Sequence, residues 1–93
     1  MTKVQLYKKE LAELLADIDD PKIMKLFLTD LFTYAEYEDF GLRLQIIKML
    51  ETGTPQRKIA KDLGVGVATV TRGSTMLKNT KGGFKKILGS YYE

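Results

Sequence analysis

The sequence contains no cysteine and no histidine. Without cysteine there is no disulfide, no thiol nucleophile and no thiolate-bound metal, and without histidine the usual general base and metal ligand are missing. The chain also has no carboxylate cluster and no glycine-rich phosphate loop, so we expect neither an enzyme nor a metal site. Its apolar runs are too short to span a bilayer, and its first residues lack the apolar stretch of a secretory signal. A cytoplasmic location is the resulting expectation.

Charge is present but unevenly distributed along the chain. The net charge of the 93 residues is +3. Residues 1–53 hold seven Lys or Arg and ten Asp or Glu, a net charge of −3, whereas residues 54–93 hold eight and two, a net charge of +6. A basic half favours a polyanionic partner such as nucleic acid, although a lysine-rich solvated surface would give the same count.

Apolar spacing and helix-stop signals predict an all-helical chain that forms a single domain. We expect helices over residues 2–18, 21–32, 33–52, 55–63 and 67–78, and a C-terminal helix within 79–93. The boundaries follow from Asp20 before Pro21, a Thr33–Glu36 capping box, Gly53 as a left-handed stop and Thr54 as a cap before Pro55. In the third helix the apolar positions expected to face inward are Phe40, Leu44, Ile47 and Leu50.

The predicted helix over residues 21–32 is unusually apolar. Its large apolar residues are Ile23, Met24, Leu26, Phe27, Leu28, Leu31 and Phe32. Because they cover more than one side of a helix, we interpret this segment as an intersubunit element within a dimerisation region over residues 1–53. A central helix wrapped by others in a monomer is the alternative.

The segment from Gln56 to Thr75 has the spacing of a helix-turn-helix, which we place over residues 54–78. Ala60 is small where the second helix must cross, and Gly64, four positions later, tolerates the positive φ of the turn. Apolar residues expected to pack around this turn are Ile59, Leu63, Val65 and Val70. A plain helical hairpin is the alternative.

The predicted helix over residues 67–78 has three sides when it is turned by about 100° per residue. The core side carries Val70, Ser74 and Leu77. A second side, free of acids and able to enter a major groove, carries Val67, Ala68, Thr71, Thr75 and Lys78. The third side carries Thr69, Arg72, Gly73 and Met76. A cation among small and apolar residues is typical of the wall of a small anion-bearing ligand site.

The run GVGVATVTRGSTMLK, residues 64–78, together with Gly41-Leu42-Arg43, resembles the tryptophan repressor family of bacterial amino-acid biosynthesis. The resemblance extends over residues 33–78, half of the chain. It implies an all-helical, intertwined homodimer that represses transcription by binding double-stranded operator DNA. It also implies L-tryptophan as the corepressor and no other cofactor.

Residue roles follow from the resemblance position by position. Arg72 would pair with the ligand carboxylate, and Arg43 would stack on the indole ring. Thr33, Thr69 and Gly73 would line the slot, and bound ligand would hold the two reading heads about 34 Å apart. The positions matching DNA contacts are Gln56, Arg57, Gly66, Val67, Ala68, Thr71 and Lys78.

The sequence departs from the family pattern at three places. Met76 stands where a Ser is usual, Ala60 stands where a Lys is usual, and the junction over residues 53–56 is one residue shorter. These departures bear on which ligand and which operator are bound. A constitutive helix-turn-helix DNA-binding protein and a helical dimerisation or adaptor module are the alternative functions.

Overall fold

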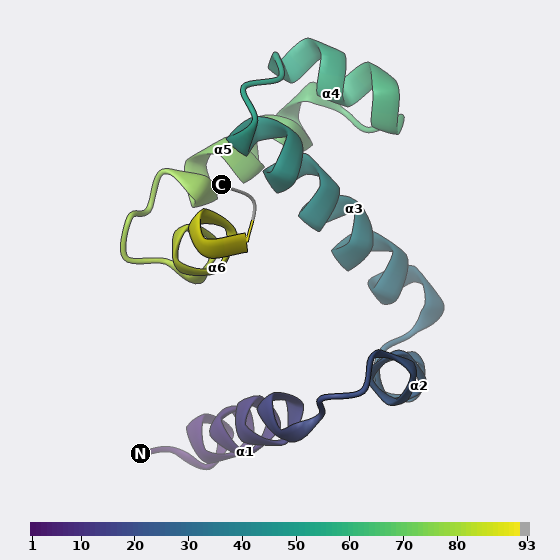
Figure 1. Cartoon of the computed structure of the whole chain (residues 1–93), viewed down its shortest axis with the longest axis vertical. Coiled ribbons are helices and arrows are strands. Elements are labelled where there is room, and N and C mark those ends of the chain that lie inside the picture. The colour runs from purple at the N-terminus through teal and green to yellow at the C-terminus, as the bar shows by residue number, and fades with distance from the viewer. Residues whose placement is uncertain (92–93) are drawn as a thin grey trace. The chain divides into compact units, whose positions relative to one another are not determined.

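The computed structural model describes residues 1–91, and all regular secondary structure within them is helical (Figure 1). The helices are α1 (Lys3–Asp17), α2 (Pro21–Leu31), α3 (Tyr34–Glu51), α4 (Gln56–Leu63), α5 (Val67–Leu77) and α6 (Gly83–Tyr91). The all-helical prediction is therefore confirmed. None of the helices in this part of the chain is long and apolar enough to cross a membrane. The chain divides into two compact units, Met1–Tyr37 and Glu38–Glu93.

In the first unit, side chains cap both helices at their N-termini. Thr2 and Gln5 form a capping box for α1, which sequence reasoning missed. Asp20 accepts a hydrogen bond from the Lys22 N–H at 2.9 Å, with Pro21 at the first position of α2, as predicted. Phe32 follows α2 as its C-cap, so this helix ends one residue earlier than expected.

The first unit also leaves much apolar surface uncovered. Neither α1 nor α2 contains a buried residue in the single chain. On α2, Ile23, Leu26 and Leu31 are 52%, 64% and 43% exposed, while Phe27 and Leu28 are half-buried. The predicted dimerisation role of residues 1–53 stays a prediction, because it concerns the pairing of two chains.

The predicted capping box at the start of α3 is confirmed. The Glu36 N–H donates to the Thr33 hydroxyl at 3.1 Å, and the Thr33 N–H donates to the Glu36 carboxylate at 2.9 Å. The hydrogen bond from the Thr33 backbone, followed by that involving its side chain, lowers the pKa of Glu36. The ionised carboxylate thus satisfies a donor that the first turn leaves without a partner.

We expect the lowered pKa of Glu36 to make the stability of α3 dependent on pH. A carboxyl whose pKa is lower in the folded state stabilises it above the unfolded pKa of about 4.3, and this contribution is lost as the pH falls further. In Glu36→Gln the cap is kept but does not titrate. The difference between the urea midpoints of wild type and Glu36→Gln should therefore shrink from pH 7 to pH 3; a constant difference would contradict this role.

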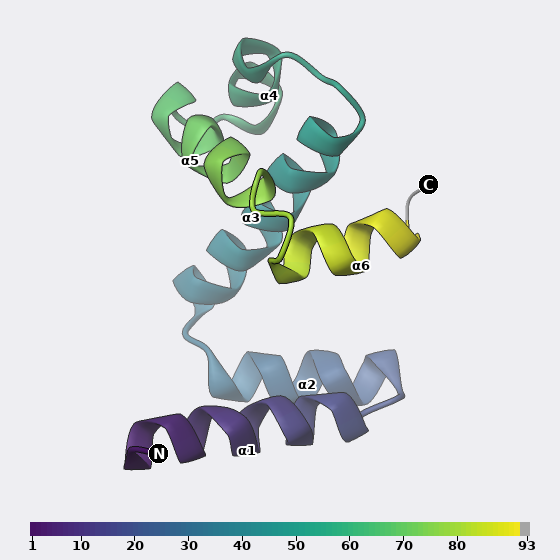
Figure 2. The same cartoon turned by 90° about the vertical axis from the view of Figure 1, so that its left-hand side faces the viewer.

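The second unit has two small clusters of buried residues, and α3, which lies beside α4, α5 and α6 (Figure 2), contributes to both. Ile46 packs with Ile59 and Ala60 of α4 and with Val70 of α5. Ile47, the next residue along α3, packs with Leu77 of α5 and Leu88 of α6. Neighbouring residues on a helix point about 100° apart, so α3 can hold α4 and α5 on one side and α6 on another.

The expected inward face of α3 is only partly correct. Ile47 is buried and Leu50 packs against both clusters, as predicted. Phe40 and Leu44, in contrast, are 38% and 41% exposed, and the buried Ile46 was missed. The reason is that the second unit packs on the last turns of α3, whereas periodicity alone gives every turn the same inward face.

The connection from α3 through α4 to α5 is tight at both ends. Gly53 and Gly64 have φ angles of +86° and +68°, the left-handed conformation predicted for both. Pro55, rather than Thr54, is the N-cap of α4, which begins one residue later than expected and has no side-chain cap. The Thr54 N–H instead donates to the Met49 carbonyl at 2.9 Å, which turns the chain immediately after α3.

The C-terminal segment begins with a turn before α6. The Lys81 N–H and the Gly82 N–H both donate to Asn79, so the helix expected within 79–93 starts at Gly83. Lys85 forms an ion pair with Glu51 of α3 at 3.2 Å. Residues 92 and 93 of the predicted helix lie outside the described residues.

Candidate functional site

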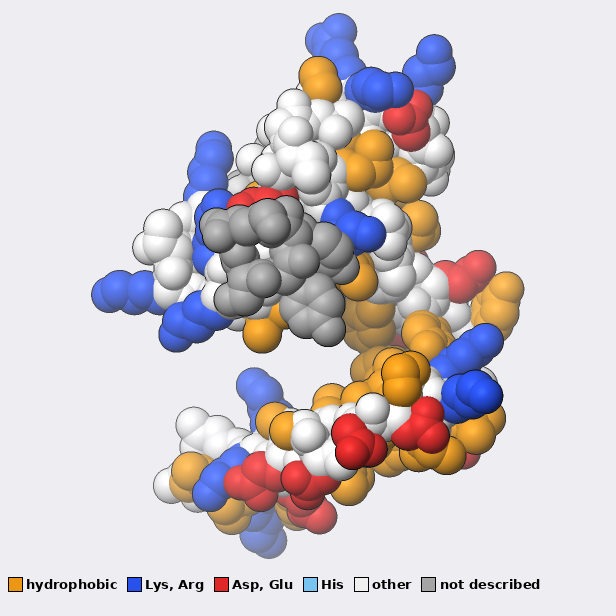
Figure 3. Space-filling model, in the orientation of Figure 1, with side chains coloured by type: hydrophobic (Ala, Val, Ile, Leu, Met, Phe, Trp, Pro, Cys, Tyr) orange, Lys and Arg blue, Asp and Glu red, His pale blue; other side chains and the backbone are white. Residues whose placement is uncertain are grey.

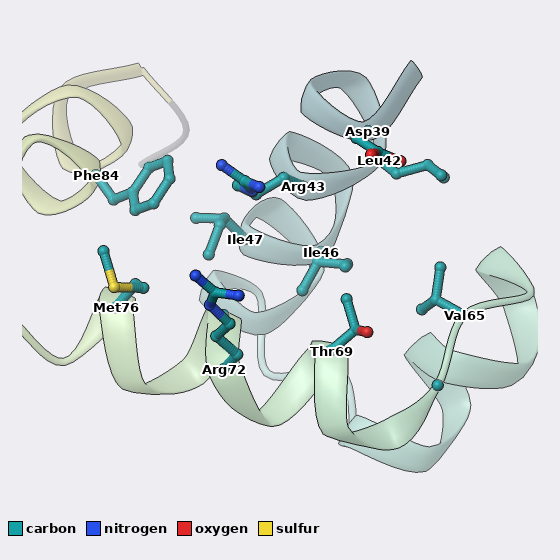
Figure 4. Close-up of a pocket in the computed structure, with 12 residues that line it drawn as sticks. Asp39, Leu42, Arg43, Ile46, Ile47, Val65, Thr69, Arg72, Met76 and Phe84 are labelled. Atoms are coloured by element: carbon teal, nitrogen blue, oxygen red, sulfur yellow. The ribbon is translucent and has the colours of Figure 1, made fainter. Parts of the chain in front are cut away.

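The second unit contains a cavity of about 570 Å³ between α3 and α5 (Figure 4). Helix α5 lines it with Thr69, Arg72, Gly73 and Met76, the four residues predicted to share the third side of this helix. Helix α3 contributes Arg43 and, deeper, Ile46 and Ile47. Four of the five residues expected to bind ligand, Arg43, Thr69, Arg72 and Gly73, therefore surround one cavity.

The two arginines approach the cavity from different helices. Figure 4 shows the Arg43 and Arg72 side chains directed toward the space between α3 and α5. The Arg43 Cζ lies 5.3 Å from the centroid of the Phe40 ring, a cation–π contact that orients the guanidinium. Two guanidinium groups facing one space provide a strong site for an anionic group and a flat surface for an aromatic ring.

Gly73 determines how closely α5 can approach α3. It is buried, and a Cβ at this position would lie 3.0 Å from the Ile46 Cγ2 and 3.4 Å from the Ile47 Cδ1. A larger residue would push the helices apart or displace these isoleucines. Gly73 is thus a packing residue of the cavity floor in addition to the lining residue that the sequence predicts.

The cavity wall also carries one negative charge, at Asp39. Within the part of the chain that the structure describes, no ion pair joins Asp39 to Arg43 or Arg72. Sequence reasoning missed Asp39 as a site residue, although its i,i+4 spacing from Arg43 places both on one face of α3. A wall with both signs of charge suits a ligand that carries both an anion and a cation.

One end of the cavity is apolar. Met76 from α5 and Phe84 from α6 lie there together (Figure 4). Phe84 was missed because the sequence gives no sign that α6 folds back onto this cavity. Thr33 belongs to the first unit, where its hydroxyl caps α3, and its place in a ligand site stays a prediction.

The opposite side of α5 is exposed and free of acids. Val67, Ala68, Thr71, Thr75 and Lys78 are all exposed, as the three-sided division of this helix predicts. Gln56 begins α4 next to this face, and its Oε1 accepts a hydrogen bond from the Thr71 hydroxyl at 2.8 Å. Arg57 is exposed, and Gly66 is the N-cap of α5 and also lines the cavity.

The helix next to this exposed face, α4, carries three exposed basic residues, Arg57, Lys58 and Lys61. Lys and Arg side chains project from the end of the second unit where α4 lies (Figure 3). Lys58 pairs with Asp62 at 3.0 Å, an exposed ion pair that contributes little stability. The exposed face of α5 and the cavity lie on two sides of one helix.

Comparison with known proteins places the chain in a class of transcriptional regulators rather than enzymes. More specifically, the sequence pattern described as "Trp repressor protein" matches residues 7–91, and the chain belongs to the Trp repressor family. The family predicted from residues 33–78 is therefore confirmed.

Three relatives named "Trp operon repressor homolog" show the extent of the similarity. The one from Actinobacillus succinogenes is 51% identical over 53 residues, covering 56% of this chain and 52% of the relative. One from Haemophilus influenzae is 47% identical over 53 residues, with coverages of 56% and 52%. One from Vibrio parahaemolyticus is 39% identical over 72 residues, with coverages of 76% and 70%. In the first two alignments the chain spans about half the length of the curated relatives it matches.

Proposed function

We propose that this protein is a ligand-controlled transcriptional repressor of the bacterial cytoplasm. In this proposal it binds operator DNA as a homodimer, with L-tryptophan in the cavity as the corepressor. The observation that carries the proposal is the position of the cavity: it holds two arginines directly behind the acid-free face of α5.

The chemistry of the cavity supports an amino acid as ligand. Its volume of about 570 Å³ lies within the range of about 300–1,000 Å³ that is typical of small-molecule sites. Arg72 would pair with the carboxylate and Arg43 would stack on an aromatic side chain, with Thr69 and Gly73 lining the slot. Asp39 supplies the opposite charge for the ammonium group. Met76 has no hydroxyl for that group, so it favours contact with apolar atoms of the ligand.

The proposed mechanism is a shift between orientations of α5. Ligand that contacts both α3 and α5 stabilises the one relative orientation in which both helices reach it. In a dimer this would fix the two α5 helices about 34 Å apart, one turn of B-DNA. Without ligand, α5 is restrained by the contacts around Gly73, by the two apolar clusters and by the Thr71–Gln56 hydrogen bond.

The exposed apolar surfaces support the homodimer. In the single chain, α2 exposes Ile23, Leu26 and Leu31, and α3 exposes Phe40 and Leu44. Apolar surface of this extent is costly in water and is typical of surface that a second subunit covers. A second copy of the chain is the occupant we propose, because the resemblance to the tryptophan repressor family implies an intertwined homodimer.

The proposed DNA contacts divide between phosphates and bases. Arg57 and Lys78 would bind phosphates, as would the first N–H groups of α4 and α5, which have no side-chain cap. Gly66, Val67, Ala68 and Thr71 would lie against base edges, where small side chains allow close approach. Gln56 lies beside the base-reading residues, because its Oε1 accepts a hydrogen bond from Thr71.

The proposal is tested by measuring DNA affinity with and without L-tryptophan, using a duplex that the protein selects from a random-sequence library. We expect tryptophan to raise the affinity and Arg57→Ala to lower it at every salt concentration. Affinity should fall steeply between about 50 and 200 mM salt, because each neutralised phosphate releases a counterion. A flat salt response would contradict DNA binding, and equal affinity with and without any amino acid would favour the constitutive alternative.

A further inference from the structure

The hydrogen bond between Gln56 and Thr71 joins two helices at the proposed DNA-binding face. The Thr71 hydroxyl donates to the Gln56 Oε1 at 2.8 Å, across 15 residues of sequence. Thr75, one turn further along α5, behaves differently: its hydroxyl donates to the Thr71 carbonyl at 3.2 Å. Both threonine donors of this face are therefore used inside the protein.

A threonine hydroxyl has one donor and two acceptor lone pairs. Since Thr71 uses its donor on Gln56, it offers the solvent side only acceptor lone pairs and its methyl group. Val67 and Ala68, nearby on the same face, have no side-chain donor either. The α5 side chains at the centre of this face can thus accept hydrogen bonds and make apolar contacts but cannot donate; a side-chain donor beside them is the Gln56 Nε2, on α4.

Base edges in the major groove differ in what they offer such a surface. Adenine and cytosine present an amino donor and thymine presents a methyl, whereas guanine presents only the acceptors N7 and O6. An A·T pair suits Thr71 from either strand, through the adenine amino group or the thymine methyl. A G·C pair suits it only where the cytosine amino group lies nearest.

We infer that Gln56 is a positioning residue that sets the base preference of Thr71, so that the position read by Thr71 selects an A·T pair. This inference rests on the proposed function, because it requires that α5 enter the major groove. It goes beyond that function by assigning the choice of base to a hydrogen bond within the protein.

The experiment uses selection from a random-sequence duplex library with the full-length protein, in the presence of L-tryptophan. Comparison with Thr71→Ala identifies the base pair whose preference depends on Thr71. We expect wild type to prefer A·T over G·C there by about fivefold to tenfold, the discrimination of one good contact. Gln56→Ala frees the Thr71 hydroxyl to donate a hydrogen bond to guanine. The preference for A·T over G·C should then fall below about twofold, because the new contact with guanine is of similar strength.

Two matched variants separate this role from others. In Gln56→Glu the carboxylate still accepts from Thr71, so the A·T preference should persist although repulsion by phosphates weakens binding. Thr75→Val removes a hydroxyl of the same face that does not contact Gln56, and it should leave the preference at the Thr71 position unchanged.

The outcomes distinguish the inference from the function on which it rests. An unchanged A·T preference in Gln56→Ala overturns the inference alone, and so does a loss of preference in Gln56→Glu as large as in Gln56→Ala. If wild type selects no sequence above random, the proposed repressor function fails and the inference fails with it.

Discussion

Phe27→Asp should leave little folded dimer. Phe27 lies in the middle of α2, beside apolar residues that a single chain leaves exposed or half-buried. In the proposed homodimer this helix is covered by the second subunit, and an unpaired carboxylate there costs on the order of 3–5 kcal/mol per subunit. Because folding and association are linked, a loss of this size removes most of the stability of a small dimeric protein.

Analytical ultracentrifugation and thermal unfolding over a range of protein concentrations measure this effect. The wild type should be a dimer whose Tm rises with concentration, and Phe27→Asp should be largely monomeric with reduced helicity. Thr29→Asp is the matched control, since it adds the same charge to an exposed polar position of α2. A well-folded wild-type monomer whose Tm does not depend on concentration would contradict the dimer.

Helix boundaries could be predicted from the sequence because they depend on local chemistry. The Asp20–Pro21 start, the Thr33–Glu36 capping box and the left-handed Gly53 and Gly64 are each fixed by residues within a few positions. Burial along α3 could not be predicted in the same way. Ile46 is buried and Phe40 is exposed because α4, α5 and α6 pack on only part of α3, and periodicity does not contain that information.

In the candidate site, too, local features could be predicted from the sequence and those that depend on distant segments could not. The side of α5 that carries Thr69, Arg72 and Met76 was found from helical geometry alone, and the structure places all of it on one cavity. Arg43 was assigned to the ligand through family resemblance, because nothing local connects it to Arg72. Neither helical geometry nor family resemblance predicted Phe84, because its position depends on α6 folding back over the cavity.

Arg72→Ala should remove the response to tryptophan while leaving ligand-free DNA binding close to that of wild type. Arg72 lines the cavity, on the side of α5 away from the exposed face that carries Thr71. Loss of a guanidinium that pairs with a carboxylate costs on the order of 2–5 kcal/mol in a buried site. Since this cavity is open to solvent, we expect about 2 kcal/mol, or about a 30-fold weaker ligand affinity.

Calorimetry with L-tryptophan measures the loss directly, and DNA affinity with and without tryptophan measures its consequence. Arg57→Ala is the control cation: it should weaken DNA binding but keep the ratio between the two conditions. If Arg72→Ala instead lowered DNA affinity and its salt dependence without changing ligand affinity, Arg72 would be a phosphate contact and the ligand site would be wrong.

Met76→Ser tests which ligand the cavity binds. Met76 cannot form a good hydrogen bond with an ammonium group, whereas Ser at this position could accept one. If tryptophan is the corepressor, this change should tighten its binding by about 1 kcal/mol, the contribution of one hydrogen bond. A wild type that fails to bind tryptophan at millimolar concentration, together with a Met76→Ser variant that binds it, would show that Met76 and Phe84 adapt the cavity to a different ligand. If neither protein bound any amino acid and both bound DNA equally well, the constitutive alternative would replace the corepressor.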